Sequence, residues 1–332
     1  MKQFQYVKPT SLQATLDVIG KPGSKIIAGG TNLIDLMKRG VTAPDKLVDI
    51  NHLGVVNHVS LRAITATKSG LSIGTLALNS VVSENDMVVQ RQPLLAMALK
   101  AGASPQLRNM ATVGGNMMQR TRCGYFYDTT MPCNKRVPGT GCGAIEGVNR
   151  MHAIFGASPQ CIAVHPSDMC VALAALDATV IIAGKKGERH IPFTAFHRLP
   201  GEHPELDNTL AKDELILGIE IPDNNFAKNS YYLKIRDRQS YAFALVSVAA
   251  ALEIDNGLIK NARLAMGGVA HKPWRLFDAE KSLVGKPATE ESFAHAAQLA
   301  MLGAKGYVNN SFKLKLAPAT ITEALKHAAG LV

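Results

Sequence analysis

Four cysteines within one short segment are the side chains of this sequence best suited to chemistry. Cys123, Cys133, Cys142 and Cys161 are separated by nine, eight and eighteen residues. Such a group of thiols indicates a soft-metal site or a disulfide framework. The spacing lacks the close cysteine pairs of structural zinc sites and the short runs of ferredoxins. An iron–sulfur cluster, a zinc site, and disulfides or unliganded core cysteines are therefore the alternatives.

The residues between the cysteines favour the iron–sulfur alternative. A cubane cluster with four thiolates is a dianion, and its burial requires nearby cations and N–H donors. The segment supplies both, as Arg120, Arg122, Lys135, Arg136 and Arg150, and as Gly124, Gly139, Gly141 and Gly143. The fifth cysteine, Cys170, stands between Met169 and Val171 on an expected apolar helix face, which predicts a small buried hydrophobic side chain.

Two glycine pairs form a second candidate site. They occur in Ala28-Gly29-Gly30-Thr31-Asn32 and in Thr112-Val113-Gly114-Gly115-Asn116. Glycine allows a nest of backbone N–H groups that can hold a pyrophosphate, and a following helix adds its positive end. One such pair is more often only a turn, but two of them, each followed by Asn, favour a phosphate-bearing cofactor. Neither matches the G-x-G-x-x-G or P-loop pattern, so the nucleotide must be held in another way.

The elements around the first glycine pair predict a small α/β unit. Strands are expected at 4–7, 25–28 and 46–50. A first helix, capped by Thr10 or Ser11, is expected to end at Gly20, and a second is expected from Leu33 to Arg39. The glycine pair then lies at the carboxyl end of a strand, where such folds usually bind ligands.

The rest of the chain predicts further sheets and helices around an irregular insert. We expect a hairpin at 61–78, helices at 80–91 and 93–103, a helix from Ser167, strands at 179–183 and 214–221, and a sheet at 231–269 followed by helices. Residues 118–165 show no periodicity, and an irregular insert of that length needs a cross-link, such as a metal cluster, to hold its conformation.

Composition excludes several classes of protein. The 332 residues are 47% hydrophobic and carry a net charge of +10, which predicts two or three globular domains. The basic residues are scattered and aromatics are only 5%, so nucleic-acid binding is not expected. No targeting segment or membrane span is predicted, which indicates a soluble chain. The positive charge suits an acidic partner subunit and anionic cofactors.

The motifs resemble the FAD-binding subunits of the xanthine oxidase family of molybdenum hydroxylases. The resemblance rests on the loop at 28–32, on 108–116 and on Pro166-Ser167-Asp168, and it spans essentially the whole chain. The cysteine segment and 234–244 resemble the subset with an extra [4Fe–4S] cluster, typified by periplasmic aldehyde oxidoreductases. The resemblance implies an α+β fold, with a two-subdomain FAD-binding domain of the PCMH type at 1–224 and a C-terminal sheet-plus-helices domain at 225–332. The subdomains are expected at about 1–55 and 56–224, with the insert at about 118–165.

The resemblance also implies the site residues and the partners. The flavin is the redox group, so no catalytic side chain is expected, and the cysteines would hold the [4Fe–4S] cluster. The FAD would be bound by Ile27, Ala28, Gly29, Gly30, Thr31, Asn32, Leu33, Thr112, Gly115, Asn116, Asp168 and Lys234. Electrons would arrive from a large molybdenum-cofactor subunit through a small subunit with two [2Fe–2S] clusters, and would leave to an external acceptor. The complex would be periplasmic, exported by a signal on the small subunit, or else cytoplasmic.

Two other functions fit some of these features. One is the flavin subunit of a hydroxybenzoyl-CoA reductase, which resembles the same family and also bears an extra cluster. The other is a basic interaction protein held together by a zinc site. Without the resemblance, Lys234 would be interpreted as an ordinary lysine on a strand surface.

Overall fold

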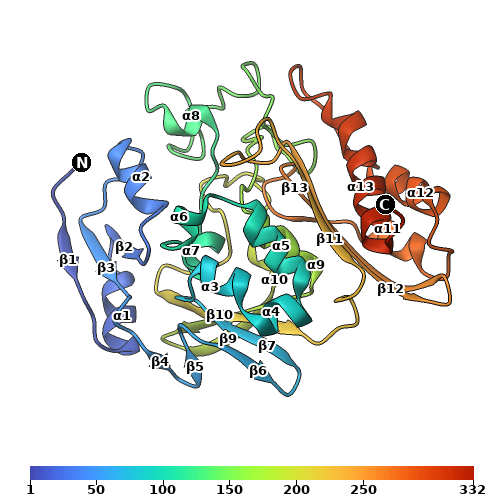
Figure 1. Ribbon diagram of the computed structural model, residues 1–332. Coiled ribbons are helices and arrows are strands. Elements are labelled where there is room, and N and C mark those ends of the chain that lie inside the picture. Colours follow the sequence, from blue (N-terminus) through green and yellow to red (C-terminus); the bar gives the residue numbers. More distant parts are fainter.

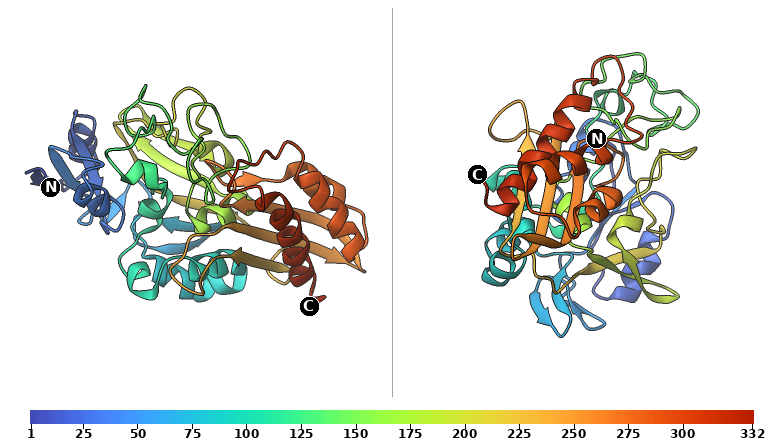
Figure 2. Two further views of the ribbon diagram at one scale, coloured as in Figure 1. Left: turned by 90° about the horizontal axis from the view of Figure 1, so that it is seen from above. Right: turned by 90° about the vertical axis from the view of Figure 1, so that its right-hand side faces the viewer.

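Three main β-sheets follow one another along the protein, whose computed structural model describes residues 1–332. The N-terminal unit lies at one end and the C-terminal helices at the other, with the cysteine-containing segment along one side (Figures 1 and 2). No helix has both the length and the apolar character needed to cross a membrane.

The N-terminal unit is the predicted α/β arrangement. Its parallel sheet has the order β1-β3-β2 and is built from β1 (Gln5–Val7), β2 (Ser24–Ile27), β3 (Lys46–Asp49), α1 (Leu12–Ile19) and α2 (Leu33–Lys38). Ser11 starts α1 because its Oγ accepts the Ala14 N–H at 3.2 Å. Leu16 and Ile19 then face the core shared with the second sheet.

The second sheet is antiparallel, with the order β6-β7-β10-β8-β9. Its strands and a neighbouring two-stranded ribbon are β4 (Val55–Val56), β5 (Val59–Ser60), β6 (Ile64–Thr67), β7 (Gly70–Gly74), β8 (Thr179–Gly184), β9 (Gly187–Pro192) and β10 (Glu214–Pro222). The helices of this domain are α3 (Asn79–Glu84), α4 (Asp86–Arg91), α5 (Pro93–Ala101), α6 (Pro105–Arg108), α7 (Val113–Met117), α9 (Asp168–Ala175) and α10 (Phe193–Phe196). Helix α9 is buried along its whole length because it packs between this domain and the third sheet.

The third sheet has the order β11-β12-β13-β14 and carries helices on one face (Figure 1). Its elements are β11 (Ser230–Ile235), β12 (Val246–Asp255), β13 (Leu258–Gly267), β14 (Trp274–Arg275), α11 (Phe277–Leu283), α12 (Glu290–Ala300) and α13 (Lys313–Ala329). Val248 and Ala250 of β12 pack against these helices, whereas Ala249 and Ala251 belong to the core around α9. The strand is apolar at both alternating sets of positions because both faces are buried.

The insert is mostly irregular, as the absence of periodicity predicted. It contains one short helix, α8 (Gly124–Tyr127). Phe126 and Cys133 form a small apolar cluster with Leu36 of α2, and Ile154 and Phe155 join the core of the third sheet. Hydrogen bonds hold much of the rest: the Arg136 guanidinium donates to the carbonyls of Tyr125 and Phe126 at 2.7 and 2.9 Å. Between residues 118 and 150 the buried hydrophobic residues are Phe126, Cys133 and Ala144, and this limited apolar burial is consistent with the expected need for a cross-link in that part of the insert.

Several predicted elements differ in detail. The helix expected at 80–91 is two helices, because Asn85 adopts an extended conformation and its Oδ1 accepts the N–H groups of Met87 and Val88. The second strand of the hairpin ends at Gly74, and β9 was not predicted. The predicted α+β fold class is nevertheless confirmed.

Candidate functional site

The first glycine loop presents a row of unpaired backbone donors. It leaves the end of β2, and none of the six residues from Ala28 to Leu33 donates its N–H to another group of the protein. Gly30 has φ of +72°, which a side chain would strain, and Gly29 lies against the second loop. A Cβ at Gly29 would stand 1.8 Å from the carbonyl oxygen of Met110. Six free donors at the edge of a sheet form a binding surface for an anion.

The second glycine loop is used differently. Its N–H groups are largely satisfied within the protein: Gly114 donates to the Thr75 carbonyl at 2.8 Å, and Gly115 donates to Thr112 Oγ1 at 3.2 Å. Gly114 also allows close packing, since a Cβ there would stand 2.0 Å from Thr75 Oγ1. This loop supports the first one, because Asn32 Nδ2 donates to the Gly115 carbonyl at 3.1 Å. The two predicted loops are therefore adjacent, but the free donors belong to the first.

Asn116 connects the second loop to helix α9. Its Oδ1 accepts the hydroxyl of Ser167 at 2.7 Å and the side-chain amide of Gln119 at 2.6 Å. Ser167 also caps α9, accepting the Cys170 N–H at 3.1 Å. The cap fixes the start of α9 and so positions Asp168, the next residue.

Asp168 forms a buried network with two residues of β11. Its Oδ2 accepts from Lys234 Nζ at 2.7 Å, and its Oδ1 accepts from the Tyr232 hydroxyl at 2.8 Å. Lys234 also donates to the Ala101 carbonyl at 3.1 Å, and its side chain is only 4% exposed. The interpretation of Lys234 as a strand-surface lysine is therefore wrong. Sequence reasoning singled out Asp168 and Lys234 but missed Tyr232.

A cavity of about 330 Å³ opens beside this network. Asp168 lines it, but Lys234 does not and lies behind Asp168. Polar and aromatic side chains from the insert, from α9 and from the third sheet complete the wall, among them Arg122, His165, Phe243 and Ser247. The volume and the mixed lining are those of a small-molecule site.

The structure brings the four cysteines of the insert around one small pocket. Cys123, Cys133, Cys142 and Cys161 all line it, and backbone bridges pair Cys133 with Cys142. All four are free thiols, so the disulfide alternative has no support in this structure. Burial raises the pKa of Cys123 to about 11 and that of Cys161 to about 12, so these thiols stay protonated unless a metal replaces the proton.

The spacing of the cysteines does not suit a single tetrahedral zinc ion. No three of these sulfurs lie within 4.8 Å of one another. Tetrahedral zinc, with bonds of about 2.3 Å, needs sulfurs roughly 3.8 Å apart. The four sulfurs as placed in this structure therefore do not form a three- or four-thiolate zinc site.

Polar residues next to this pocket only partly match those expected from the sequence. Lys135 and Arg120 pair with Asp207 at 2.6 and 2.7 Å. His152 was not predicted: its Nε2 lies 3.1 Å from Cys123 Sγ, and burial lowers its pKa to about 4.

Lys313 was not predicted either. Its ammonium is buried and donates to the carbonyls of His152 and Gly268 at 3.0 and 2.7 Å, with no carboxylate beside it. No spacing signal in the sequence could have linked this residue of α13 to a cysteine segment so far away in the chain.

The two pockets share a wall. Thr121, Cys123, Tyr125 and His152 line both the cysteine pocket and the larger cavity. Anything bound by the cysteines would therefore be next to anything bound in the cavity.

Comparisons with known families and proteins agree along the whole chain. The FAD binding domain in molybdopterin dehydrogenase matches residues 2–224, and the CO dehydrogenase flavoprotein C-terminal domain matches residues 231–328. The chain is 45% identical to the aldehyde oxidoreductase FAD-binding subunit PaoB of Escherichia coli K12, covering 99% of both sequences.

The similarity to more distant relatives also extends over most of both chains. The chain is 30% identical to the glyceraldehyde dehydrogenase medium chain of Sulfolobus acidocaldarius, covering 87% of this chain and 84% of the relative. The fold is similar to that of a chain in the solved carbon monoxide dehydrogenase of Hydrogenophaga pseudoflava, with a TM-score of 0.76 and 24% identity over 99% and 98% of the two chains.

Proposed function

The chain belongs to the family of FAD-binding subunits of molybdenum hydroxylases, as its sequence motifs predicted, and from this we propose that it is the flavin-binding electron-transfer subunit of an aldehyde oxidoreductase. Family membership excludes the zinc-stapled interaction protein as the function. The observation that carries the proposal is the run of six unpaired N–H groups on the first loop, which Asn32 connects to Arg122 of a cavity that Asp168 also lines.

We propose that the pyrophosphate of FAD lies on the first glycine loop, from Ile27 to Leu33. The free N–H groups would donate to the phosphate oxygens, with no side-chain cation required. Thr112, Gly115 and Asn116 would hold the ribityl side, chiefly by fixing the first loop and the start of α9. When bound, FAD supplies a centre that can take up and release electrons singly or in pairs.

We propose that Asp168 contacts the flavin from the cavity wall and that Lys234 acts through it. Lys234 and Tyr232 hold both carboxylate oxygens of Asp168 in place, which orients the side chain toward a bound ligand. A buried ammonium close to the cavity would also favour negative charge on a reduced flavin.

We propose that Cys123, Cys133, Cys142 and Cys161 hold a [4Fe–4S] cluster. The pocket lined by all four thiols supports this assignment. Lys313 also supports it: burial lowers the pKa of this lysine to about 7, and a dianionic cluster next to His152 would favour its charged form. His152 would donate a hydrogen bond from Nε2 to the thiolate of Cys123. The cluster would also add folding energy to the part of the insert at 118–150, which buries few apolar side chains.

We propose that the subunit works in a heterotrimer with a large molybdenum-cofactor subunit and a small subunit carrying two [2Fe–2S] clusters. Electrons from aldehyde oxidation would pass through these clusters to FAD and then to an external acceptor. Export of the assembled complex by a signal on the small subunit would place it in the periplasm. The similarity to PaoB over its whole length supports this composition.

Analysis of the purified complex tests these proposals. We expect about one FAD and four irons attributable to this chain. Cys142→Ser should lower the iron content by about four, whereas Cys170→Ser, a buried cysteine outside the pocket, should not. A colourless complex without extractable flavin would refute the function, and wild-type iron content in Cys142→Ser would refute the cluster.

A further inference from the structure

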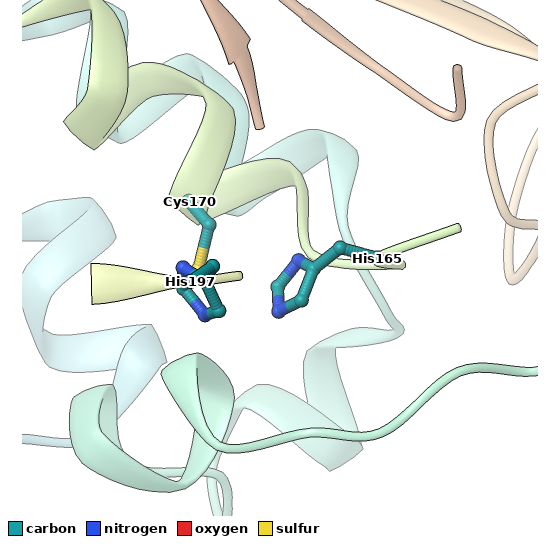
Figure 3. Close-up of side chains that lie close together, drawn as sticks. All are labelled: His165, Cys170 and His197. Carbon is teal, nitrogen blue, oxygen red and sulfur yellow. The ribbon is translucent and has the colours of Figure 1, made fainter. Parts of the chain in front are cut away.

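His165, Cys170 and His197 meet in the interior (Figure 3). His165 precedes α9, Cys170 lies in its first turn, and His197 follows α10. One potential ligand atom from each residue lies within 4.8 Å of the other two. The three residues are only 8%, 0% and 3% exposed; His165 also lines the cavity proposed for the flavin, whereas Cys170 and His197 line neither that cavity nor the cysteine pocket.

Both imidazoles have nitrogens without a partner. Nδ1 of His197 and Nε2 of His165 are buried and make no hydrogen bond. Buried polar atoms are rarely left unpaired, and an unseen ion or water is the usual reason when they are.

The second nitrogen of His197 is fixed in the way typical of a metal ligand. Its Nε2 lies 2.9 Å from the Met117 carbonyl and donates to it, so Nδ1 carries the free lone pair. Burial lowers the pKa of His197 to about 4, which keeps the ring neutral at pH 7. Nδ1 of His165 accepts only a long hydrogen bond, from the Ser167 N–H at 3.4 Å.

We propose that His165, Cys170 and His197 form a binding site for one thiophilic metal ion with a filled d shell, Cu⁺ or Zn²⁺. Two imidazoles and one thiolate are ligands that both ions accept. The thiol proton of Cys170 would leave when the metal–sulfur bond forms.

Charge and coordination number favour Cu⁺. With one thiolate and two neutral imidazoles, Cu⁺ gives a neutral site, whereas Zn²⁺ leaves one positive charge in the interior. The nearby carboxylate of Asp207 is already paired with Lys135 and Arg120 at 2.6 and 2.7 Å. Zinc also prefers a fourth ligand, which these three residues do not provide.

Metal analysis of the intact complex tests the site. The complex is expressed with added copper and zinc salts, purified, and its copper, zinc, iron and FAD are measured per chain. We expect about one copper or zinc ion per chain, reduced roughly tenfold or more in Cys170→Ala and in His197→Gln. Leu173→Val, a buried change in the same helix, is the control and should retain the ion. Iron and FAD should be unchanged, so failure of the FAD or cluster proposals would be seen separately.

X-ray absorption at the metal edge identifies the ion and its ligands. One sulfur at about 2.3 Å together with nitrogen at about 2.0 Å would support the site. Two results would overturn the proposal. The first is a wild-type complex without stoichiometric copper or zinc, in which a buried water would instead hydrogen-bond to the imidazoles. The second is a metal ion that remains bound in both Cys170→Ala and His197→Gln.

Discussion

Replacing Gly29 by alanine should separate the two glycine loops and release FAD. Gly29 does not have a positive φ, so alanine adds no backbone strain and its only defect is steric. The new Cβ would stand 1.8 Å from the Met110 carbonyl oxygen, whereas ordinary contacts begin at 3.4 Å. The loops must therefore move apart by about 1.6 Å, and the obstacle is backbone, which cannot rotate away.

The size of the effect follows from the hydrogen bonds that such a shift would break. A displacement of that size exceeds the tolerance of an N–H···O bond. If two of the bonds to phosphate are lost, at about 1.5–3 kcal/mol each for a charged acceptor, FAD binding weakens by about 3–6 kcal/mol. At about 1.4 kcal/mol per tenfold change, the Kd for FAD should rise roughly 10²- to 10⁴-fold.

The assay is titration of the deflavinated complex with FAD, followed by flavin fluorescence. Gly54→Ala is the matched control, because Gly54 has no atom within 4 Å of the added methyl group and no positive φ. That variant should bind FAD like the wild type. Wild-type affinity in a normally folded Gly29→Ala complex would refute the placement of the pyrophosphate on this loop.

Three further substitutions test the Lys234–Asp168 ion pair, the cap provided by Thr112 and the carboxylate of Asp207. Lys234→Met breaks a buried ion pair and should cost about 3–5 kcal/mol, seen as a lower thermal midpoint that adding Asp168→Asn partly restores. Thr112→Val removes the cap on Gly115 N–H and should cost about 0.5–2 kcal/mol, measured by denaturant unfolding. Burial acts to raise the pKa of Asp207, but the charges of Lys135 and Arg120 hold it well below its ordinary value. The ionised Asp207 carboxylate therefore stabilises the folded protein above about pH 4, and this contribution is lost at lower pH. The thermal midpoint of Asp207→Asn should consequently fall less steeply below pH 4 than that of the wild type. An equal acid dependence in both proteins would contradict this.

Local signals in the sequence were enough to predict the elements that carry the first loop. Ser11 and Ser167 cap the helices expected from them, and the strand ending at Ile27 leads directly into the glycine pair. These predictions succeeded because they depend on residues a few positions apart. The division of the helix at Asn85 was missed although a capping residue was visible, because the apolar pattern continues across it.

The arrangement of the site depends on long-range contacts that no local pattern encodes. The role of the second glycine pair as a support becomes visible only when Gly29 meets Met110 and Asn32 reaches Gly115. The burial of Lys234 follows from the packing of β11 on α5 and from the ion pair with Asp168 at the start of α9. The alternation of that strand alone suits a surface lysine equally well. Cys170 was correctly predicted to be buried, but its proximity to two histidines was not predicted.

The shared wall between the two pockets bears on what the cysteine segment is for. If the segment served only to stabilise the fold, its metal site could lie anywhere along the insert. Instead Cys123 and His152 face both the cysteine pocket and the cavity proposed for the flavin. A purely structural role therefore makes a sharp prediction: a Cys142→Ser complex that assembles and keeps its FAD should show wild-type kinetics of flavin reduction by aldehyde. Slower reduction in such a complex, with full flavin content, would mean that the cysteine site also influences the redox behaviour of the neighbouring cavity.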